Sequence, residues 1–208
     1  MKKQNIWTKA VTPQIKSNMQ ESAHAAYANG CALLEDALFL VTADRYPRAT
    51  ALAILAEEEF SKAFILLVSA MNGRWDSNIF LSLRKHSNKQ GISEAMLDYL
   101  DWFKQNYQWV MEINRYTLVQ AQPDIHPGDE KMEQLYAKAK SRFAKPIRDY
   151  LKQDAFYVSI DEDGKPKSIP NSIGKEDALR YLKDSEKFQV VVEMLLGDPN
   201  AAKKYAWF

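Results

Sequence analysis

The sequence predicts a mainly α-helical fold, in which an N-terminal four-helix unit is followed by a helix, a small β-hairpin and a final helix. Two observations lead to this prediction. Apolar residues recur every three or four positions over most of the chain, as they do on helices that pack through one face. A cluster of turn-forming residues at 122–129 interrupts this pattern. We therefore expect an N-terminal helical section, residues 1–121, that carries the polar site, and a C-terminal section, residues 129–208, packed on the same core.

The first two helices are defined by their end signals. Thr12-Pro13 has the pattern of an N-cap followed by a first-turn proline, and apolar positions continue at helical spacing to about Thr42. Residues 44–47 make a turn. A central helix is then predicted over 48–71, where Asn72-Gly73 provides a C-terminal stop.

The later elements are predicted in the same way from periodicity, turn residues and strand composition. In order they are a short third helix capped by Asp76 or Ser77 that ends near Arg84, a fourth helix over 93–119, a helix over 129–153 that Pro146 should kink, a hairpin with strands at 155–160 and 165–169, and a last helix over 175–196. An aromatic tail, Tyr205 to Phe208, follows the last helix.

The composition excludes several classes of protein. A net charge of +1 gives no broad basic surface, so DNA binding is not expected. The single cysteine, Cys31, excludes a disulfide framework, fits a reducing compartment, and stands among small and apolar residues that predict a buried thiol. No apolar run approaches the length of a membrane span, and no signal-peptide pattern occurs. We therefore expect a soluble cytoplasmic protein.

The central helix carries charges in an unusual place. It is apolar on two opposite faces, which predicts that Glu58, Glu59 and Lys62 look into the protein, while Glu57 points to a face where solvent is plausible. Glu58 and Lys62 stand at i and i+4 and can pair, so Glu59 needs a partner from another helix. The alternative is a solvated ion-pair stripe on a surface helix.

Known metal and cofactor patterns are missing from the sequence. It has no Gly-rich phosphate loop and no nucleophile elbow. A di-iron bundle would require a histidine three residues after Glu59, where Lys62 stands instead. The three histidines, at 24, 86 and 126, are far apart in the sequence, and the chain has only one cysteine, so no zinc-ligand cluster is apparent. We expect neither a cofactor nor a metal.

A histidine in a cationic run is the remaining candidate for chemistry. Arg84, Lys85, His86 and Lys89 combine a side chain that titrates near neutrality with charges that suit a phosphate. Metal-free RNA cleavage needs a base for the 2′-hydroxyl, an acid for the leaving oxygen, and cations on the phosphate. The alternative is an exposed helix end, where basic residues complement the helix dipole.

The order of several segments resembles the AbiV family of bacterial abortive-infection proteins. The most specific part is Glu58-Glu59-x-x-Lys62 followed by His86-x-x-Lys89. The likeness covers about residues 23–195, and its other parts are Leu34-Glu35-Asp36-Ala37, Tyr46, the rest of the segment 53–63, Phe156-Tyr157-Val158, Asp163-Gly164 and Pro170.

The resemblance implies an antiparallel helical bundle of the HEPN type and a role in phage defence, in which protein synthesis of the infected cell is shut down. Many HEPN proteins are metal-independent ribonucleases that act as dimers, with the active site at the junction of two bundles. Their usual signature places several residues between an Arg and a His, whereas only Lys85 separates Arg84 from His86.

Two functional hypotheses follow. In the first, the protein is a metal-independent ribonuclease: His86 is the general acid or base, Arg84 and Lys89 bind the phosphate, Glu59 orients His86, and Glu58 with Lys62 is a supporting pair. In the second, a non-catalytic effector blocks translation by binding a phage or host protein through its aromatic tail or hairpin, and the polar cluster is a structural lock. An antitoxin-like or scaffold bundle is a third possibility. A homodimer is expected, with no membrane partner.

Overall fold

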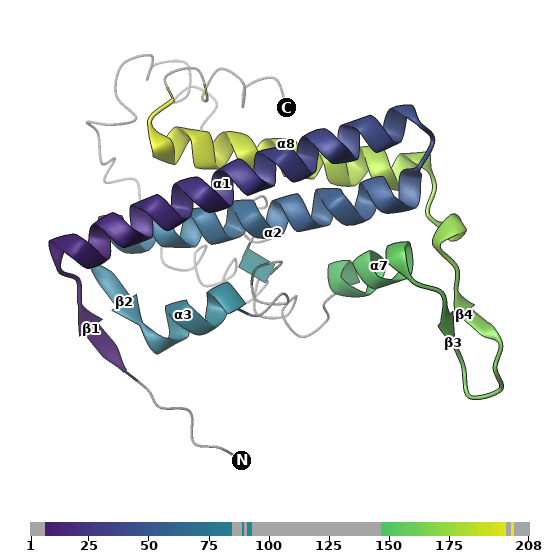
Figure 1. Ribbon diagram of the computed structural model, residues 1–208, viewed down its shortest axis with the longest axis horizontal. Coiled ribbons are helices and arrows are strands. Elements are labelled where there is room, and N and C mark those ends of the chain that lie inside the picture. Colours follow the sequence, from purple (N-terminus) through teal and green to yellow (C-terminus); the bar gives the residue numbers. More distant parts are fainter. Residues whose placement is uncertain (1–6, 85–88, 90, 93–146, 199–200, 202–208) are drawn as a thin grey trace, which may run out of the picture.

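The structure is a computed structural model that describes residues 7–84, 89, 91–92, 147–198 and 201. Its elements, in chain order, are β1 (Thr8–Ala10), α1 (Pro13–Thr42), α2 (Tyr46–Met71), β2 (Arg74–Asp76), α3 (Ser77–Arg84), α7 (Ile147–Phe156), β3 (Ser159–Ile160), β4 (Pro166–Ser168), the 3-10 helix η1 (Pro170–Ser172) and α8 (Lys175–Leu196) (Figure 1). The predicted fold class, a mainly helical bundle with a C-terminal hairpin and a final helix, is confirmed. The predicted helix over 93–119, the boundary at 122–129, Pro146 and the aromatic tail lie outside the described residues.

The long helices α1 and α2 form an antiparallel pair (Figure 1). The hydroxyl of Thr12 accepts a hydrogen bond from the backbone N–H of Ile15 at 3.2 Å, so the predicted N-cap is confirmed. Between the helices, Asp44 adopts the left-handed conformation (φ 57°), and the N–H of Arg45 returns to the carbonyl of Leu40 at 2.8 Å. This tight turn lets α2 begin at Tyr46, two residues earlier than predicted.

Small residues let the helices approach one another closely. At Gly30 of α1, a Cβ atom would lie only 2.6 Å from a ring carbon of Phe60, so the missing side chain makes room for the ring. On the other side of α2, the hydroxyl of Ser185 in α8 lies 2.8 Å from the carbonyl oxygen of Ala53. Both Phe60 and Ser185 are fully buried. The core of the bundle therefore follows α2, with α1 and α8 packed along it.

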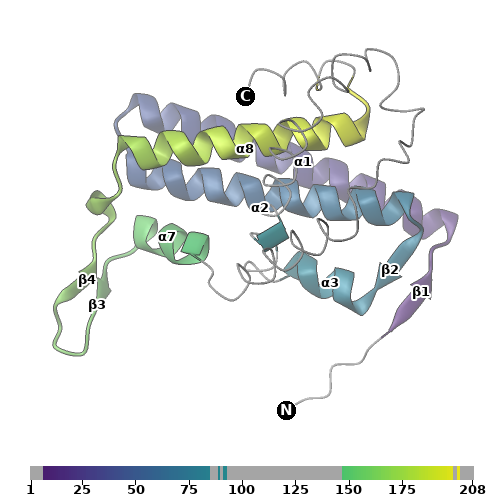
Figure 2. The same cartoon turned by 180° about the vertical axis from the view of Figure 1, so that it is seen from behind.

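The helix α2 is buried on nearly all sides. It contacts α1, α8 and α7, and both views show α7 on the side of α2 opposite to α8 (Figures 1 and 2). Sixteen of its residues are buried, among them two glutamates. Its end is as predicted: the N–H of Asn72 bonds to the carbonyl of Val68, and Gly73 has a positive φ of 61°.

Two small antiparallel sheets flank the helices. The pairing of β1 with β2, which joins Lys9 to Trp75, was not predicted from the sequence. It is supported by aromatic side chains, because the ring centroids of Trp7 and Trp75 lie 6.1 Å apart and Phe80 packs on both. The second sheet is the predicted hairpin, β3 with β4.

The first strand of the hairpin is shorter than predicted. A strand was expected over 155–160, but α7 continues to Phe156, the N–H of Tyr157 still bonds to the carbonyl of Gln153, and β3 contains only Ser159–Ile160. Ala155 is 2% exposed and packs with Ala51 and Ile173, so tertiary packing of α7 prevails over the strand composition of this segment.

Candidate functional site

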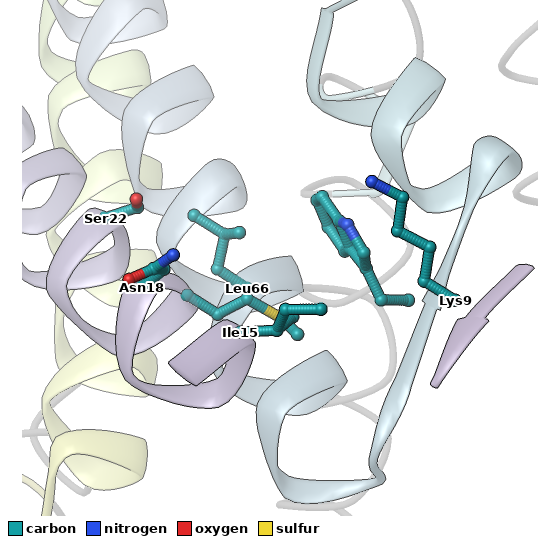
Figure 3. Close-up of a pocket in the computed structure, with 7 residues that line it drawn as sticks. Lys9, Ile15, Asn18, Ser22 and Leu66 are labelled. Carbon is teal, nitrogen blue, oxygen red and sulfur yellow. The ribbon is translucent and has the colours of Figure 1, made fainter. Parts of the chain in front are cut away.

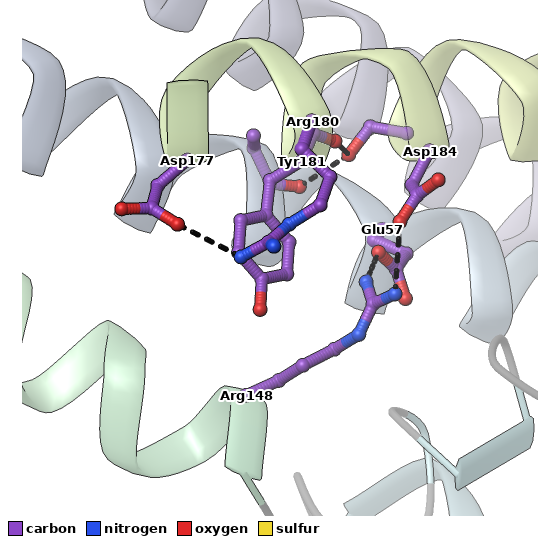
Figure 4. Close-up of polar contacts among 8 residues, drawn as sticks. Glu57, Arg148, Asp177, Arg180, Tyr181 and Asp184 are labelled. Atoms are coloured by element: carbon purple, nitrogen blue, oxygen red, sulfur yellow. Dashed lines mark hydrogen bonds and ion pairs between the residues drawn. The ribbon is translucent and has the colours of Figure 1, made fainter. Parts of the chain in front are cut away.

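Two adjacent glutamates of α2 are bound by cations of α7. Arg148 donates one hydrogen bond to Glu57 and another to Asp184 of α8, the latter at 3.2 Å (Figure 4). The side chain of Glu57 is 1% exposed and that of Arg148 is 9% exposed. The guanidinium thus joins three helices at one buried point.

The second glutamate is held by two lysines. Lys152 of α7 donates to Oε1 of Glu58 at 2.8 Å, and Nζ of Lys89 lies 3.4 Å from Oε2 of the same carboxylate. Lys152 also pairs with Asp149 at 3.0 Å. We refer to Glu57, Glu58, Lys89, Arg148, Asp149, Lys152 and Asp184 as the buried charge cluster.

The third glutamate has a more local and more exposed partner. Lys62 donates to Glu59 at 2.5 Å, and their side chains are 31% and 17% exposed. The predicted i,i+4 pair of Glu58 with Lys62 is therefore wrong, because Lys62 pairs at i,i+3 with Glu59 and Glu58 pairs with lysines from outside α2. The expectation that Glu57 faces solvent is also wrong, because α7 and α8 cover that face.

Of the three charged residues predicted to face the interior, Glu58 is buried, whereas Glu59 and Lys62 are partly exposed. The contacts of the two buried glutamates reduce the cost of burying their charge. Removing a carboxylate or an ammonium from water costs several kcal/mol unless opposite charges and hydrogen bonds replace the lost hydration. Arg148, Lys152 and Lys89 provide these partners for Glu57 and Glu58. The ring of Tyr181 adds to this, since the guanidinium carbons of Arg148 and Arg180 each lie 5.1 Å from its centroid (Figure 4).

The sequence analysis did not assign Arg148, Lys152 or Asp184 to the site. The signal for the two cations is their i,i+4 spacing on α7, which places them on the same face as the apolar Leu151 and Ala155. Cations on a buried helix face need carboxylates, and Glu57 and Glu58 needed cations. This spacing marks Arg148 and Lys152 as candidate partners for buried carboxylates, but it does not say which carboxylates they bind.

The structure brings some of the predicted site residues together. Lys89 is 5% exposed and joins Glu58, so it belongs to the buried charge cluster. Arg84 is exposed at the end of α3, where its guanidinium carbon lies 5.6 Å from the ring centroid of Phe80. His86 lies outside the described residues.

A second group of polar side chains joins α1 to α8. Tyr27 donates to Glu193 at 2.8 Å, and Gln189 donates to Glu193 at 3.2 Å and to the sulfur of Cys31 at 3.5 Å. Burial raises the pKa of the Tyr27 hydroxyl and of the Cys31 thiol above their ordinary values. The thiol, predicted to be buried, is half-buried. A raised pKa disfavours the reactive thiolate of Cys31. The hydrogen bonds of Tyr27, Gln189 and Glu193 therefore serve to join α1 to α8.

The described residues hold no group of three His, Cys, Asp or Glu side chains placed to bind a metal ion. A cavity of about 280 Å³ opens elsewhere, between the start of α1 and the β1–β2 sheet, with Lys9, Ile15, Leu66 and Trp75 among its lining residues (Figure 3). None of its lining residues belongs to the buried charge cluster. No described helix has both the length and the apolar character that crossing a bilayer requires.

Comparison with known families identifies the chain. The family model for AbiV, of the HEPN group, matches residues 18–189, a range that contains every member of the buried charge cluster. Neither a curated protein nor a solved structure matches the sequence. The match confirms the resemblance seen in the sequence. With most of its length covered, the chain belongs to the AbiV family of HEPN-like abortive-infection proteins, whose role is defence against phage.

Proposed function

We propose that the protein is an effector that arrests translation in the phage-infected cell by cleaving RNA without a metal ion. One observation carries the proposal: the buried ion pair of Lys89 with Glu58 fixes the end of the run Arg84–Lys89 to the central helix. The start of that run is fixed as well, because Arg84 is the last residue of α3. The chain between these two anchors contains His86, the side chain suited to proton transfer near neutral pH.

The burial of the cations assigns them different roles. Lys89, Arg148 and Lys152 are at most 9% exposed and are engaged by carboxylates, so they hold the site together. Arg84 is exposed and is the cation that we propose binds the phosphate. His86 is the proposed general acid or base, Glu59 orients it, and Lys62 neutralises Glu59. Glu58 acts through Lys89 as a positioning residue.

The proposed enzyme works in the cytoplasm as a homodimer, in which a second copy completes the RNA site. Support for this part comes from the HEPN relationship of the family, together with the single cysteine, which fits a reducing compartment. Sedimentation of the purified protein at micromolar concentration should therefore show a dimer.

Cleavage of purified tRNA, mRNA and rRNA in EDTA tests the proposal. The wild type should leave 2′,3′-cyclic phosphate ends, and His86→Ala should cut at least a hundredfold more slowly, as expected for the loss of a general acid or base. His24→Ala is the matched control, because His24 is exposed on α1 away from the cluster, and it should cut like the wild type. Equal cutting by the wild type and His86→Ala would remove His86 from the mechanism.

Exposed apolar side chains on the hairpin favour a second candidate, a non-catalytic effector that blocks translation by binding a phage or host protein. Tyr157, Val158 and Ile160 are 68%, 58% and 68% exposed. A translation assay in cell extract separates the candidates. Arrest that survives His86→Ala but fails in Val158→Asp and Ile160→Asp supports the binding effector, and the reverse result supports the ribonuclease.

A further inference from the structure

A groove lies between the start of α2 and the segment that joins α7, the hairpin and η1. Its volume is about 390 Å³. The lining residues come from two distant parts of the chain, with Asp44, Arg45 and Arg48 on one side and Phe156, Val158 and Ile169 on the other. No residue of the buried charge cluster lines it, so the groove is separate from the proposed RNA site.

One wall of the groove is apolar and open to solvent. Phe156 is 41% exposed, Val158 is 58% exposed and Ile169 is 48% exposed. Beside the groove, the ring centroid of Tyr157 lies 6.2 Å from that of Phe156, and Tyr157 is 68% exposed. Isolated exposed apolar residues are ordinary, but a contiguous group beside a concavity is typical of a site that binds a protein segment.

The other wall is cationic. Arg45 and Arg48 are exposed, and neither guanidinium forms an ion pair within the part of the chain that the structure describes. Asp44 also lines the groove, but its carboxylate accepts a hydrogen bond from the hydroxyl of Tyr46. Two arginines beside an apolar wall complement a ligand that carries a carboxylate next to bulky apolar groups.

We propose that this groove binds an extended segment of another protein in which one or two acidic residues adjoin large apolar residues. The carboxylates would lie against Arg45 and Arg48, and the apolar side chains against Phe156, Val158 and Ile169. RNA fits less well, because most of the lining offers no partner for a phosphate backbone. The inference goes beyond the ribonuclease proposal, and it gives the binding effector a specific site.

An array of random decapeptides, probed with the full-length protein, tests the chemistry of the groove. Bound peptides should be enriched in Asp or Glu next to Leu, Ile, Phe or Trp. A fluorescein-labelled copy of the strongest peptide then serves as the probe in polarisation measurements. Arg45→Ala with Arg48→Ala, and separately Val158→Asp with Ile169→Asp, should each weaken its binding at least tenfold.

Matched controls and a charge exchange make the test specific. Arg180→Ala removes an exposed arginine of α8 and Phe39→Asp alters an exposed aromatic residue of α1, and both should bind the probe like the wild type. Arg48→Glu should lose the acidic peptide and gain affinity for its Lys-substituted counterpart.

Three outcomes would overturn the inference: no acidic enrichment on the array, probe binding that is unchanged in the groove variants, or loss of a dimer as the main effect of Val158→Asp with Ile169→Asp. The last result would identify the surface as an interface between copies of this chain. RNA cleavage by the same variants is measured in parallel. Because Arg45 and Arg48 lie outside the proposed catalytic run, failure of peptide binding with cleavage intact removes this inference alone.

Discussion

Lys152 and Glu58 form a hydrogen-bonded ion pair at 2.8 Å, and both side chains are almost completely removed from solvent. The pair joins α7 to the centre of α2, and Lys89 approaches the same carboxylate from a third part of the chain. Because each charge depends on its partner for solvation, the charged groups in this cluster should respond to mutation as a unit.

Breaking the pair of Glu57 with Arg148 from one side should destabilise the protein strongly. Arg148→Met leaves Glu57, 1% exposed, without its guanidinium, and should lower the free energy of unfolding by about 3–5 kcal/mol. Adding Glu57→Gln to Arg148→Met should recover part of that loss, because a neutral amide then replaces the buried carboxylate at position 57. Urea denaturation of the wild type, both single variants and the double variant gives the coupling energy. A double variant less stable than Arg148→Met would contradict the assignment.

Lys62 should contribute far less than the buried cations. Its pair with Glu59 is partly exposed, and such pairs contribute about 0–1 kcal/mol, so Lys62→Ala should unfold at nearly the same urea concentration as the wild type. Lys152→Ala is the matched comparison, because it truncates the same side chain at a buried position, and it should be clearly less stable. Equal midpoints for the two variants would mean that burial does not set the strength of these pairs.

These two predictions show what sequence alone could and could not provide. Both ends of α1 and α8 and the C-terminal end of α2 were predictable because caps, glycines and apolar spacing are local signals. The partner of Glu58 was not predictable, because Lys152 is distant in sequence. The assumption that Glu58 pairs within α2 led to Lys62 instead. The helical periodicity of α2 also placed Glu57 toward solvent, because the sequence of one helix does not show where another helix, here α7, packs against it. The two apolar faces of α2 did predict that Glu58 is buried, and that inference did not depend on knowing its partner.

The hairpin shows the same division. Asp161 and Gly164 identified its turn, and the structure places the N–H of Lys165 2.8 Å from the Asp161 carboxylate, with Gly164 at a φ of 77°. The predicted boundary between helix and strand was wrong, because Phe156 and Tyr157 are residue types typical of strands, whereas Ala155 packs as part of α7. The composition of residues 155–160 carries no information on the packing of Ala155 against Ala51 and Ile173. His86 lies outside the described residues, so its position in the site stays a prediction.

Asp76 should stabilise α3 in a pH-dependent manner. Its carboxylate accepts hydrogen bonds from the N–H groups of Ile79 (3.0 Å) and Asn78 (2.9 Å) and from Arg74 (2.8 Å). The N–H of Ile79, followed by Arg74, holds the pKa of Asp76 below its ordinary value. A lowered folded-state pKa stabilises the protein above the unfolded pKa of about 3.9, and this contribution is lost as pH falls through the folded value.

The measurement is urea denaturation of the wild type and Asp76→Ala between pH 7 and pH 3. At pH 7 the variant should be about 1 kcal/mol less stable, and the difference should shrink in acid as Asp76 is protonated. Asp76→Asn retains the capping oxygen without the charge, so its stability relative to Asp76→Ala should change little with pH. A wild-type advantage that grows toward pH 3 would reverse the sign and contradict the cap.

Gly30→Ala should destabilise the protein although alanine is the better helix former. A Cβ at this position meets two carbons of the Phe60 ring at 2.6 and 2.8 Å, and Phe60 is fully buried with little room to move. Overpacking of this kind costs about 1–3 kcal/mol, against a propensity gain of about 1 kcal/mol. The exposed Asn29 calibrates that gain through Asn29→Gly and Asn29→Ala on the same helix. Phe60→Leu added to Gly30→Ala should relieve the contact, so a double variant no more stable than the additive sum would show that α1 and α2 do not meet there.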